Sequence, residues 1–187
     1  MRTAICVFAA LCLAAGNADG AERRTVAIPV AEPTAVSITG QLYLPEGAGP
    51  FPAIVALHGC GGFFARGGTK PSGRHADWAV RLVGAGYVVL FPDSFTARGF
   101  TEICTLKDRP VTSRSRAFDV AAAARWLAGQ PFVDKDRLGL LGWSHGAATT
   151  LHAVREGFMT APPRFKTAIA FYPGCRELLR QPDWRPS

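Results

Sequence analysis

The pattern of apolar and polar positions along the chain predicts strands that alternate with helices. Apolar runs of strand length occupy residues 53–57 and 87–91, and two further strands with mostly apolar residues are predicted over 137–141 and 167–172. Such runs are typical of strands that are covered on both faces, as in a parallel sheet. A looser alternation over residues 36–44, which ends at a Pro-Glu-Gly turn, predicts one more strand, and another is expected near residues 25–30.

The segments between these strands have helical spacing. Residues 75–84 place Trp78 and Leu82 on one face, residues 113–130 are rich in alanine, and residues 145–155 follow the third apolar run. Strands in alternation with helices predict an α/β fold with a mainly parallel sheet and helices on both faces. Functional residues are then expected at the carboxyl ends of the strands.

The first 20 residues are predicted to be a signal peptide. Arg2 precedes an uncharged apolar run over residues 4–15, and the small residues Gly16, Ala18 and Gly20 follow it. The run is too short to span a bilayer comfortably. We therefore expect a secreted or periplasmic protein with a mature domain over residues 21–187 and no stable membrane insertion after cleavage.

Charge and cysteine content narrow the function classes. The net charge is +7, but no nucleic-acid-binding motif accompanies it, so we expect a solvated basic surface, including residues 109–116, and no nucleic-acid partner. No CxxC or HxxxH pair is present, so we predict no metal. Three cysteines remain after signal cleavage, Cys60, Cys104 and Cys175, and export favours a disulfide between two of them with one thiol left over.

The pentapeptide Gly142-Trp143-Ser144-His145-Gly146, called the elbow below, carries the predicted chemistry. It lies between a predicted strand and a predicted helix, the context in which G-x-S-x-G exposes a serine nucleophile on a strained turn. Ser144 is therefore the predicted catalytic residue. The N–H group of His145 points from the same turn toward the site and is a candidate donor to the oxyanion.

The glycine-rich loop, residues 58–62, follows another buried strand with the sequence His58-Gly59-Cys60-Gly61-Gly62. Its backbone N–H groups are candidates for the second oxyanion donor, and either Cys60 or Gly61 fits that role. His58 is expected to hold this loop by hydrogen bonds rather than to take part in catalysis.

Together these motifs resemble the dienelactone hydrolase family of α/β-hydrolases, in particular its exported serine members. The resemblance runs from about residue 36 to residue 175, in the family's order, and is carried by Leu57 with the glycine-rich loop, Pro92-Asp93-Ser94-Phe95 with Arg98-Gly99, Gln130-Pro131-Phe132-Val133-Asp134, the elbow, and Phe171-Tyr172-Pro173-Gly174-Cys175. It implies hydrolysis of a small-molecule ester or lactone through an acyl-enzyme, without metal or organic cofactor. The chain departs from the founding members in having Ser144 where they have cysteine.

The acid and the histidine of a catalytic triad are not apparent. In α/β-hydrolases both follow the nucleophile, and no histidine follows His152, which lies about 12 Å along its helix from the serine. We expect the side chain of His145 to point away from the nucleophile and His75 to face solvent. Asp183 is expected to be a solvated loop carboxylate.

Three interpretations of this gap stay open. The first is a C-terminally incomplete dienelactone hydrolase, an α/β-hydrolase fold that lacks its last strands and so leaves a sheet edge unprotected. The second is a non-catalytic α/β-hydrolase-like binding protein. The third is a site that a partner chain completes by supplying the histidine.

Overall fold

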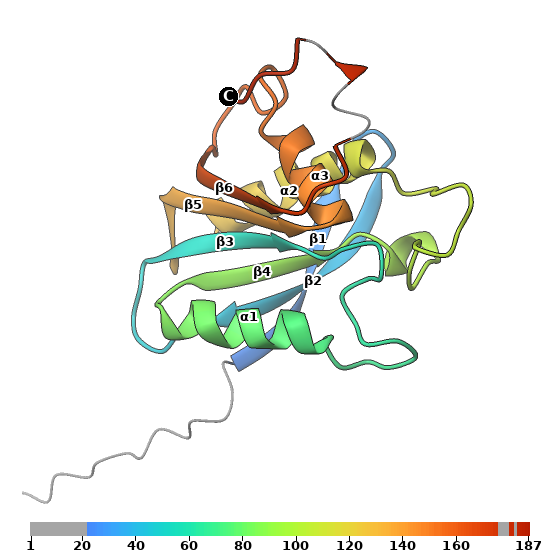
Figure 1. The fold of residues 1–187 in the computed structure, drawn as a ribbon. Coiled ribbons are helices and arrows are strands. Elements are labelled where there is room, and N and C mark those ends of the chain that lie inside the picture. Colours follow the sequence, from blue (N-terminus) through green and yellow to red (C-terminus); the bar gives the residue numbers. More distant parts are fainter. Residues whose placement is uncertain (1–21, 176–179, 182) are drawn as a thin grey trace, which may run out of the picture.

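Six strands form one sheet with helices on both of its faces (Figure 1). The computed structural model describes residues 22–175, 180, 181 and 183–187, so the predicted signal peptide lies outside the described residues. The strands are β1 (Glu22–Val30), β2 (Val36–Leu44), β3 (Phe51–Leu57), β4 (Val88–Asp93), β5 (Val133–Trp143) and β6 (Phe165–Phe171).

The sheet order is β1-β2-β4-β3-β5-β6. Strands β4, β3, β5 and β6 pair in parallel, whereas β1 and β2 join them in antiparallel fashion. The predicted α/β class and mainly parallel sheet are confirmed. Strand β5 begins earlier than predicted, at Val133, where it pairs with Phe51; four charged residues in a row after Val133 conceal the strand pattern there.

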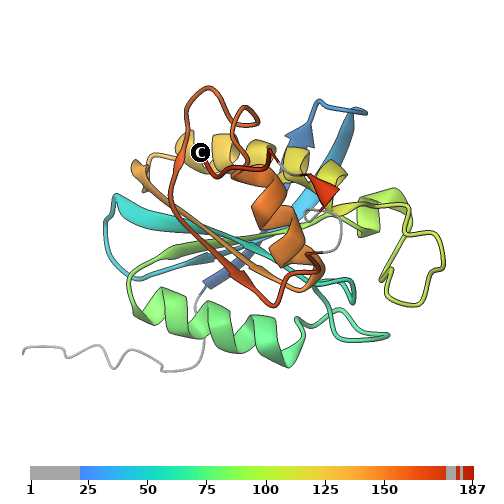
Figure 2. The same cartoon turned by 45° about the horizontal axis from the view of Figure 1, so that its top comes forward.

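Helix α1 (Gly73–Gly84) covers one face of the sheet, and α2 (Ser113–Ala128) and α3 (His145–Ala153) cover the other (Figure 1, Figure 2). A short 3-10 helix, η1 (Thr96–Arg98), follows β4. Thr112 is the N-cap residue that precedes α2, and its hydroxyl accepts a hydrogen bond from the backbone N–H of Ser115 at 3.0 Å. Its alanine side chains are buried and small, so α2 packs close to the sheet.

The prediction that His75 faces solvent is wrong. Its side chain is buried on the inner side of α1, where the ring stacks on Phe63 at 5.3 Å and lies near Phe91 and Trp143. The ring Nδ1–H donates to the backbone oxygen of Phe63 at 2.9 Å. Sequence spacing on α1 did not reveal this contact because Phe63 belongs to a loop that folds back over the helix start.

Strand β6 lies at the edge of the sheet, and Ile169 in its centre is 49% exposed. The last residues of the chain instead contact the end of α3, where the indole N–H of Trp184 donates to Leu151 and the N–H of Ser187 donates to Val154. These carbonyls belong to the helix end and have no partner within the helix. No helix in the described part of the chain is long and apolar enough to cross a membrane.

Candidate active site

Ser144 lies at the sharp turn that joins β5 to α3. Its backbone has φ 53° and ψ −114°, a conformation that costs a non-glycine residue about 1–3 kcal/mol. The N–H of Ser144 donates to the carbonyl of Phe171 at the end of β6, at 3.0 Å, and the carbonyl of Ser144 accepts from Ala148 in α3, also at 3.0 Å. The serine is therefore held in a strained turn by hydrogen bonds to the strand beside it and the helix after it.

The two glycines of the elbow are required by close backbone contacts. A Cβ atom on Gly142 would collide with the carbonyl oxygen of Gly146, and one on Gly146 would collide with the carbonyl oxygen of Leu57 and lie 2.7 Å from that of His58. The elbow thus packs directly against the end of β3. Ser144 thus lies on a sharp turn between a strand and a helix, the context in which the G-x-S-x-G pattern was interpreted.

The glycine-rich loop lies against the serine. A Cβ atom on Gly59 would be 3.6 Å from the Cβ of Ser144. Within the described chain, the backbone N–H groups of Cys60, Gly61 and His145 donate to no protein acceptor. The three candidate donors are therefore not used by an acceptor within the described chain, and an oxyanion site requires donors of this kind.

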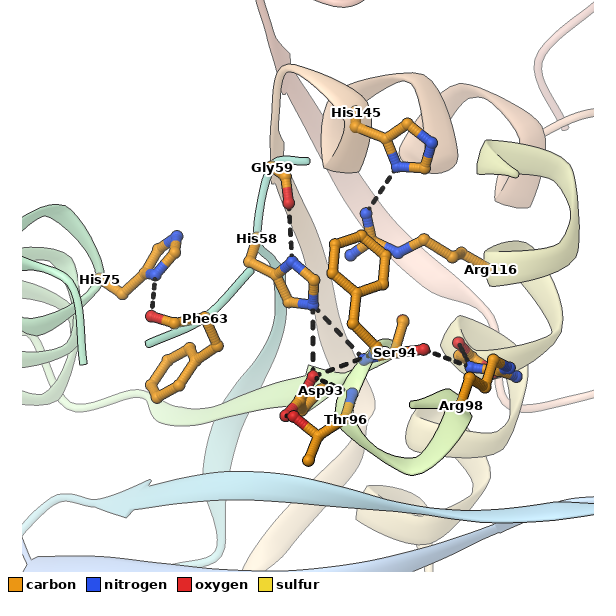
Figure 3. Close-up of polar contacts among 12 residues, drawn as sticks. His58, Gly59, Phe63, His75, Asp93, Ser94, Thr96, Arg98, Arg116 and His145 are labelled. Atoms are coloured by element: carbon orange, nitrogen blue, oxygen red, sulfur yellow. Dashed lines mark hydrogen bonds and ion pairs between the residues drawn. The ribbon is translucent and has the colours of Figure 1, made fainter. Parts of the chain in front are cut away.

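His58 holds the base of the glycine-rich loop. Its side chain is fully buried; the ring Nδ1–H donates to the carbonyl of Gly59 at 2.8 Å, and Nε2 accepts from the N–H of Ser94 at 3.4 Å (Figure 3). Burial, together with the positive charge of Arg116, lowers the pKa of His58 well below its usual value. The neutral ring is thus the stable form, and the expected structural role of His58 agrees with these contacts.

Arg116 is the residue near the elbow that the sequence did not reveal. It was expected on a solvated basic surface, but its side chain is fully buried, and its Nη1–H donates to Nδ1 of His145 at 2.9 Å (Figure 3). Its guanidinium carbon also lies 5.1 Å from the centre of the Phe95 ring, a cation–π contact. A signal was present: Arg116 shares the apolar face of α2 with buried residues four and seven positions later, Val120 and Ala123.

The contact with Arg116 determines the state of His145. Its Nδ1 accepts a hydrogen bond, so the ring is neutral with the proton on Nε2. Burial, and the nearby charge of Arg116, lower the pKa of His145 to about 3. Burial likewise lowers the pKa of Arg116 to about 10, so the guanidinium remains protonated at neutral pH. A fixed positive charge therefore lies beside the first residue of α3.

The loop after β4 forms the base of this region. The carboxylate of Asp93 is buried and accepts hydrogen bonds from the N–H groups of Phe95 and Thr96. Arg98 forms a bidentate ion pair with the fully buried Asp119 of α2, at 2.8 and 3.0 Å. These contacts fix the loop that carries Phe95 beneath the glycine-rich loop.

A disulfide joins Cys60 of the glycine-rich loop to Cys104, and Cys175 is free and exposed. The predicted pairing of two of the three mature cysteines is confirmed. No group of three or more His, Cys, Asp or Glu side chains that could hold a metal ion occurs among the described residues.

The histidines give no evident base for Ser144. The pKa values of His58, His75 and His145 are all lowered, chiefly by burial, and each ring donates or accepts a hydrogen bond within the protein core. A general base is most effective when its pKa lies near the working pH. His152 is buried farther along α3. Asp183 is exposed, as predicted.

The sequence matches the dienelactone hydrolase family over residues 38–184. No curated protein matches the chain. Among solved structures, the α/β-hydrolase GrgF from Penicillium sp. sh18 has a TM-score of 0.61 at 21% identity, with 81% of this chain and 46% of that chain covered. A candidate dienelactone hydrolase from Klebsiella pneumoniae has a TM-score of 0.58 at 20% identity, with 81% and 60% covered.

Dipeptidyl peptidase 4 from Porphyromonas gingivalis is similar over a smaller part of its length. The TM-score is 0.60 at 26% identity, with 82% of this chain and 21% of that chain covered. The chain therefore spans less than two thirds of each of these three proteins. The similarities show a shared fold over about four fifths of this chain.

Proposed function

The chain belongs to the dienelactone hydrolase family, and from that premise we propose that it contributes to a hydrolase of ester or lactone bonds in which Ser144 is the nucleophile. The observation that carries the proposal is the strained serine at φ 53° beside three backbone N–H groups that have no acceptor in the described chain. Strain at a serine with free amides around it is typical of a nucleophile elbow.

The proposed reaction forms an acyl-enzyme. The Oγ of Ser144 attacks the carbonyl carbon of a small-molecule ester or lactone, and a base takes the hydroxyl proton. The N–H of His145, with that of Cys60 or Gly61, stabilises the oxyanion. The C–O bond of the substrate then breaks, the leaving oxygen takes the proton, and water hydrolyses the acyl-enzyme in a second step.

The base and the acid of the triad are proposed to come from outside these 187 residues. The buried, low-pKa histidines of the chain support this, as does its coverage of only 46% and 60% of two similar hydrolases. Without its base, a serine hydrolase retains only the residual rate that the oxyanion donors and binding supply. We therefore expect the isolated chain to react slowly.

Export to the periplasm or the exterior is part of the proposal. The predicted signal peptide motivates it, and the Cys60–Cys104 disulfide supports it, because disulfides persist in oxidising compartments. Expression of the full chain behind its own N-terminus, followed by N-terminal sequencing of the exported form, tests this. A mature protein that starts near residue 19 or 21 is expected, and a protein that keeps Met1 and stays in the cytoplasm would contradict it.

A fluorophosphonate probe tests the proposed nucleophile, because it phosphonylates activated serines. The full chain is expected to take up one equivalent, whereas Ser144→Ala takes up none; Ser94→Ala, which removes a buried hydroxyl on another loop, serves as the matched control and should label as the parent does. Equal labelling of the parent and Ser144→Ala would refute the proposal.

The alternative is a non-catalytic binding protein, favoured by the absence of a histidine poised to act as base. In that case Ser144 would not label even at high probe concentration, while esters or lactones would still raise the melting temperature of the protein. The two outcomes separate a slow enzyme from a binding module.

A further inference from the structure

We infer that the Cys60–Cys104 disulfide, together with the segment that ends at Cys104, positions the glycine-rich loop for oxyanion binding. This segment, residues 100–104, is called the supporting segment below. Cys104 and Ile103 are then positioning residues for the reaction proposed above, on which the inference rests.

The supporting segment is attached to Cys60 at two points. The disulfide joins the side chains of Cys60 and Cys104, and the backbone N–H of Ile103 donates to the carbonyl of Cys60 at 2.8 Å. Both the side chain and the carbonyl of Cys60 are therefore held. Its N–H, by contrast, has no acceptor in the described chain, so this group is fixed in place yet free to donate to a ligand.

A third contact lies two residues farther along the loop. Gly62 has φ +81°, and a Cβ atom there would collide with the carbonyl oxygen of Thr101. The N–H of Gly62 also donates to the carbonyl of Gly59 at 3.2 Å, which closes the turn that contains Cys60 and Gly61. The supporting segment thus contacts both sides of the turn that carries the two candidate donors.

The supporting segment is itself anchored in the core. Ile103, Phe95 and Val111 form a buried apolar cluster, and Cys60 packs against it. The ring of Phe95 meets that of His58 edge-on, with 4.6 Å between the ring centres. The cluster therefore supports the glycine-rich loop from below, and the disulfide ties the loop to it. Figure 2 shows the long connection between η1 and α2 at the same end of the sheet as the loop after β3.

The side of the loop that faces the supporting segment is hollow. A cavity of about 560 Å³ lies between them and is lined by Gly61, Phe63, Phe64, Thr101 and Cys104, among others. An open cavity gives the loop space into which it can move. The disulfide is the covalent one of the contacts that oppose this movement, and cutting it should loosen Cys60 and Gly61.

Oxyanion stabilisation requires donors that are already in place before the charge develops. Removing one donor altogether lowers the rate about 10²–10³-fold. When the loop is loosened, the donors are still present, but part of their interaction with the oxyanion is offset by the entropy cost of ordering them. We therefore expect the reaction rate to fall about tenfold.

The test compares the parent chain with Cys104→Ser, with Cys175→Ser as the matched control because Cys175 is exposed and unpaired. Two quantities are measured: hydrogen–deuterium exchange of the amides of Gly62 and Ile103, which donate to the carbonyls of Gly59 and Cys60, and the maximal rate of phosphonylation by a fluorophosphonate probe together with its half-saturating concentration. Exchange reports the loop whether or not Ser144 is reactive, so it separates this inference from the proposed function.

In Cys104→Ser we expect these amides to exchange about tenfold faster than in the parent. We also expect the maximal labelling rate to fall about tenfold, while the half-saturating probe concentration stays unchanged. The labelled fraction should still reach completion. A merely structural lesion would reduce the labelled fraction and leave the rate of the remaining folded molecules unchanged. Unaltered exchange in Cys104→Ser overturns the inference, whatever the labelling shows.

Chemical reduction provides a second route if Cys104→Ser fails to fold. A dithiol reagent donates two electrons and two protons to the Cys60–Cys104 bond, which gives two thiols while the reagent closes to its own cyclic disulfide. Reduction of the folded parent should reproduce the faster exchange and slower labelling, and Cys175→Ser should respond in the same way. Exchange that is unchanged after complete reduction, as counted by thiol titration, overturns the inference.

Discussion

The elbow and the glycine-rich loop both present backbone N–H groups near Ser144, but the chain holds them there by different means. The elbow is fixed by local sequence: its two glycines lie so close to neighbouring carbonyls that a Cβ atom would collide with them, and the serine adopts a strained backbone conformation. The loop is fixed by distant residues, through a disulfide to a cysteine 44 positions later and a buried cluster after β4. One half of the site is thus built by close packing and the other by cross-linking.

The largest expected effect tests the cross-link. Closing a loop of this length lowers the entropy of the unfolded chain enough to stabilise the fold by about 4 kcal/mol. We expect Cys104→Ser to lower the free energy of unfolding by about this amount in urea titrations. The Cys175→Ser control should change it by less than about 0.5 kcal/mol, as exposed substitutions usually do.

The next effect tests the close packing. Gly146→Ala places a methyl group against the carbonyls of Leu57 and His58, so the elbow and β3 must separate. Such overpacking typically costs up to about 3 kcal/mol. Gly61→Ala is the counterpart in the loop: its Cβ would meet nothing within 4 Å, and its cost should be within about 0.5 kcal/mol. Similar losses from both substitutions, in the same urea titration, would show that the two regions do not differ in packing.

The imidazole of His145 gives the elbow a contribution to stability that depends on pH, and the glycine-rich loop can be compared with it in this respect. Unfolded His145 takes up a proton near its ordinary pKa of about 6.5, whereas the folded ring stays neutral down to about 3. The unfolded state therefore binds more protons between these values, and stability falls as the pH decreases through this window, by about 2 kcal/mol from pH 8 to pH 5.

The variant His145→Gln keeps an acceptor for Arg116 but cannot titrate. Its loss of stability between pH 8 and pH 5 should be about 2 kcal/mol smaller than that of the parent, while the contributions of the buried His58 and His75 remain in both. Parallel curves of unfolding free energy against pH for the two proteins would exclude a buried neutral His145.

The smallest effect tests the strain at Ser144. Glycine adopts φ 53°, ψ −114° without steric cost, whereas alanine does not, so Ser144→Gly should be more stable than Ser144→Ala by about 1 kcal/mol. At a helical position alanine should be the more stable of the two residues. Ala148→Gly in α3 is therefore expected to be less stable than the parent by about 1 kcal/mol or more, through lost helix propensity and burial. Differential scanning calorimetry of the three variants measures both differences; a Ser144→Ala protein as stable as Ser144→Gly would show that the turn is unstrained.

The same contrast explains how much of the molecule the sequence could predict. Among the described residues the six strands and the three α-helices were expected, because buried runs and turn residues are local signals, whereas the short 3-10 helix η1 was not. The elbow was expected for the same reason, since Gly142 and Gly146 record the close contacts in the pentapeptide itself. The strand Val36–Leu44 was predicted with the bounds that it has in the structure, because a Pro-Glu-Gly turn marks its end.

The features that sequence reasoning missed depend on contacts between distant segments. His75 is buried because Phe63, twelve positions earlier, folds over it. Arg116 is buried because His145 and Phe95 meet it from two other elements. The choice of Cys104 as the partner of Cys60 follows from where the connection after β4 returns to the glycine-rich loop. Of these contacts only the burial of Arg116 leaves a periodic signal in its own segment, through its place on the apolar face of α2, and the segment does not show which residues meet it.

The most direct test of the central claim is to find the acyl-enzyme. The full chain is incubated with p-nitrophenyl acetate, quenched in acid, digested and analysed by mass spectrometry, with Ser144→Ala treated in parallel to identify non-specific acetylation. The account predicts an acetyl group on Ser144 that is absent from the same peptide of the variant. A parent protein that is acetylated only at lysines, to the same extent as Ser144→Ala, would contradict it.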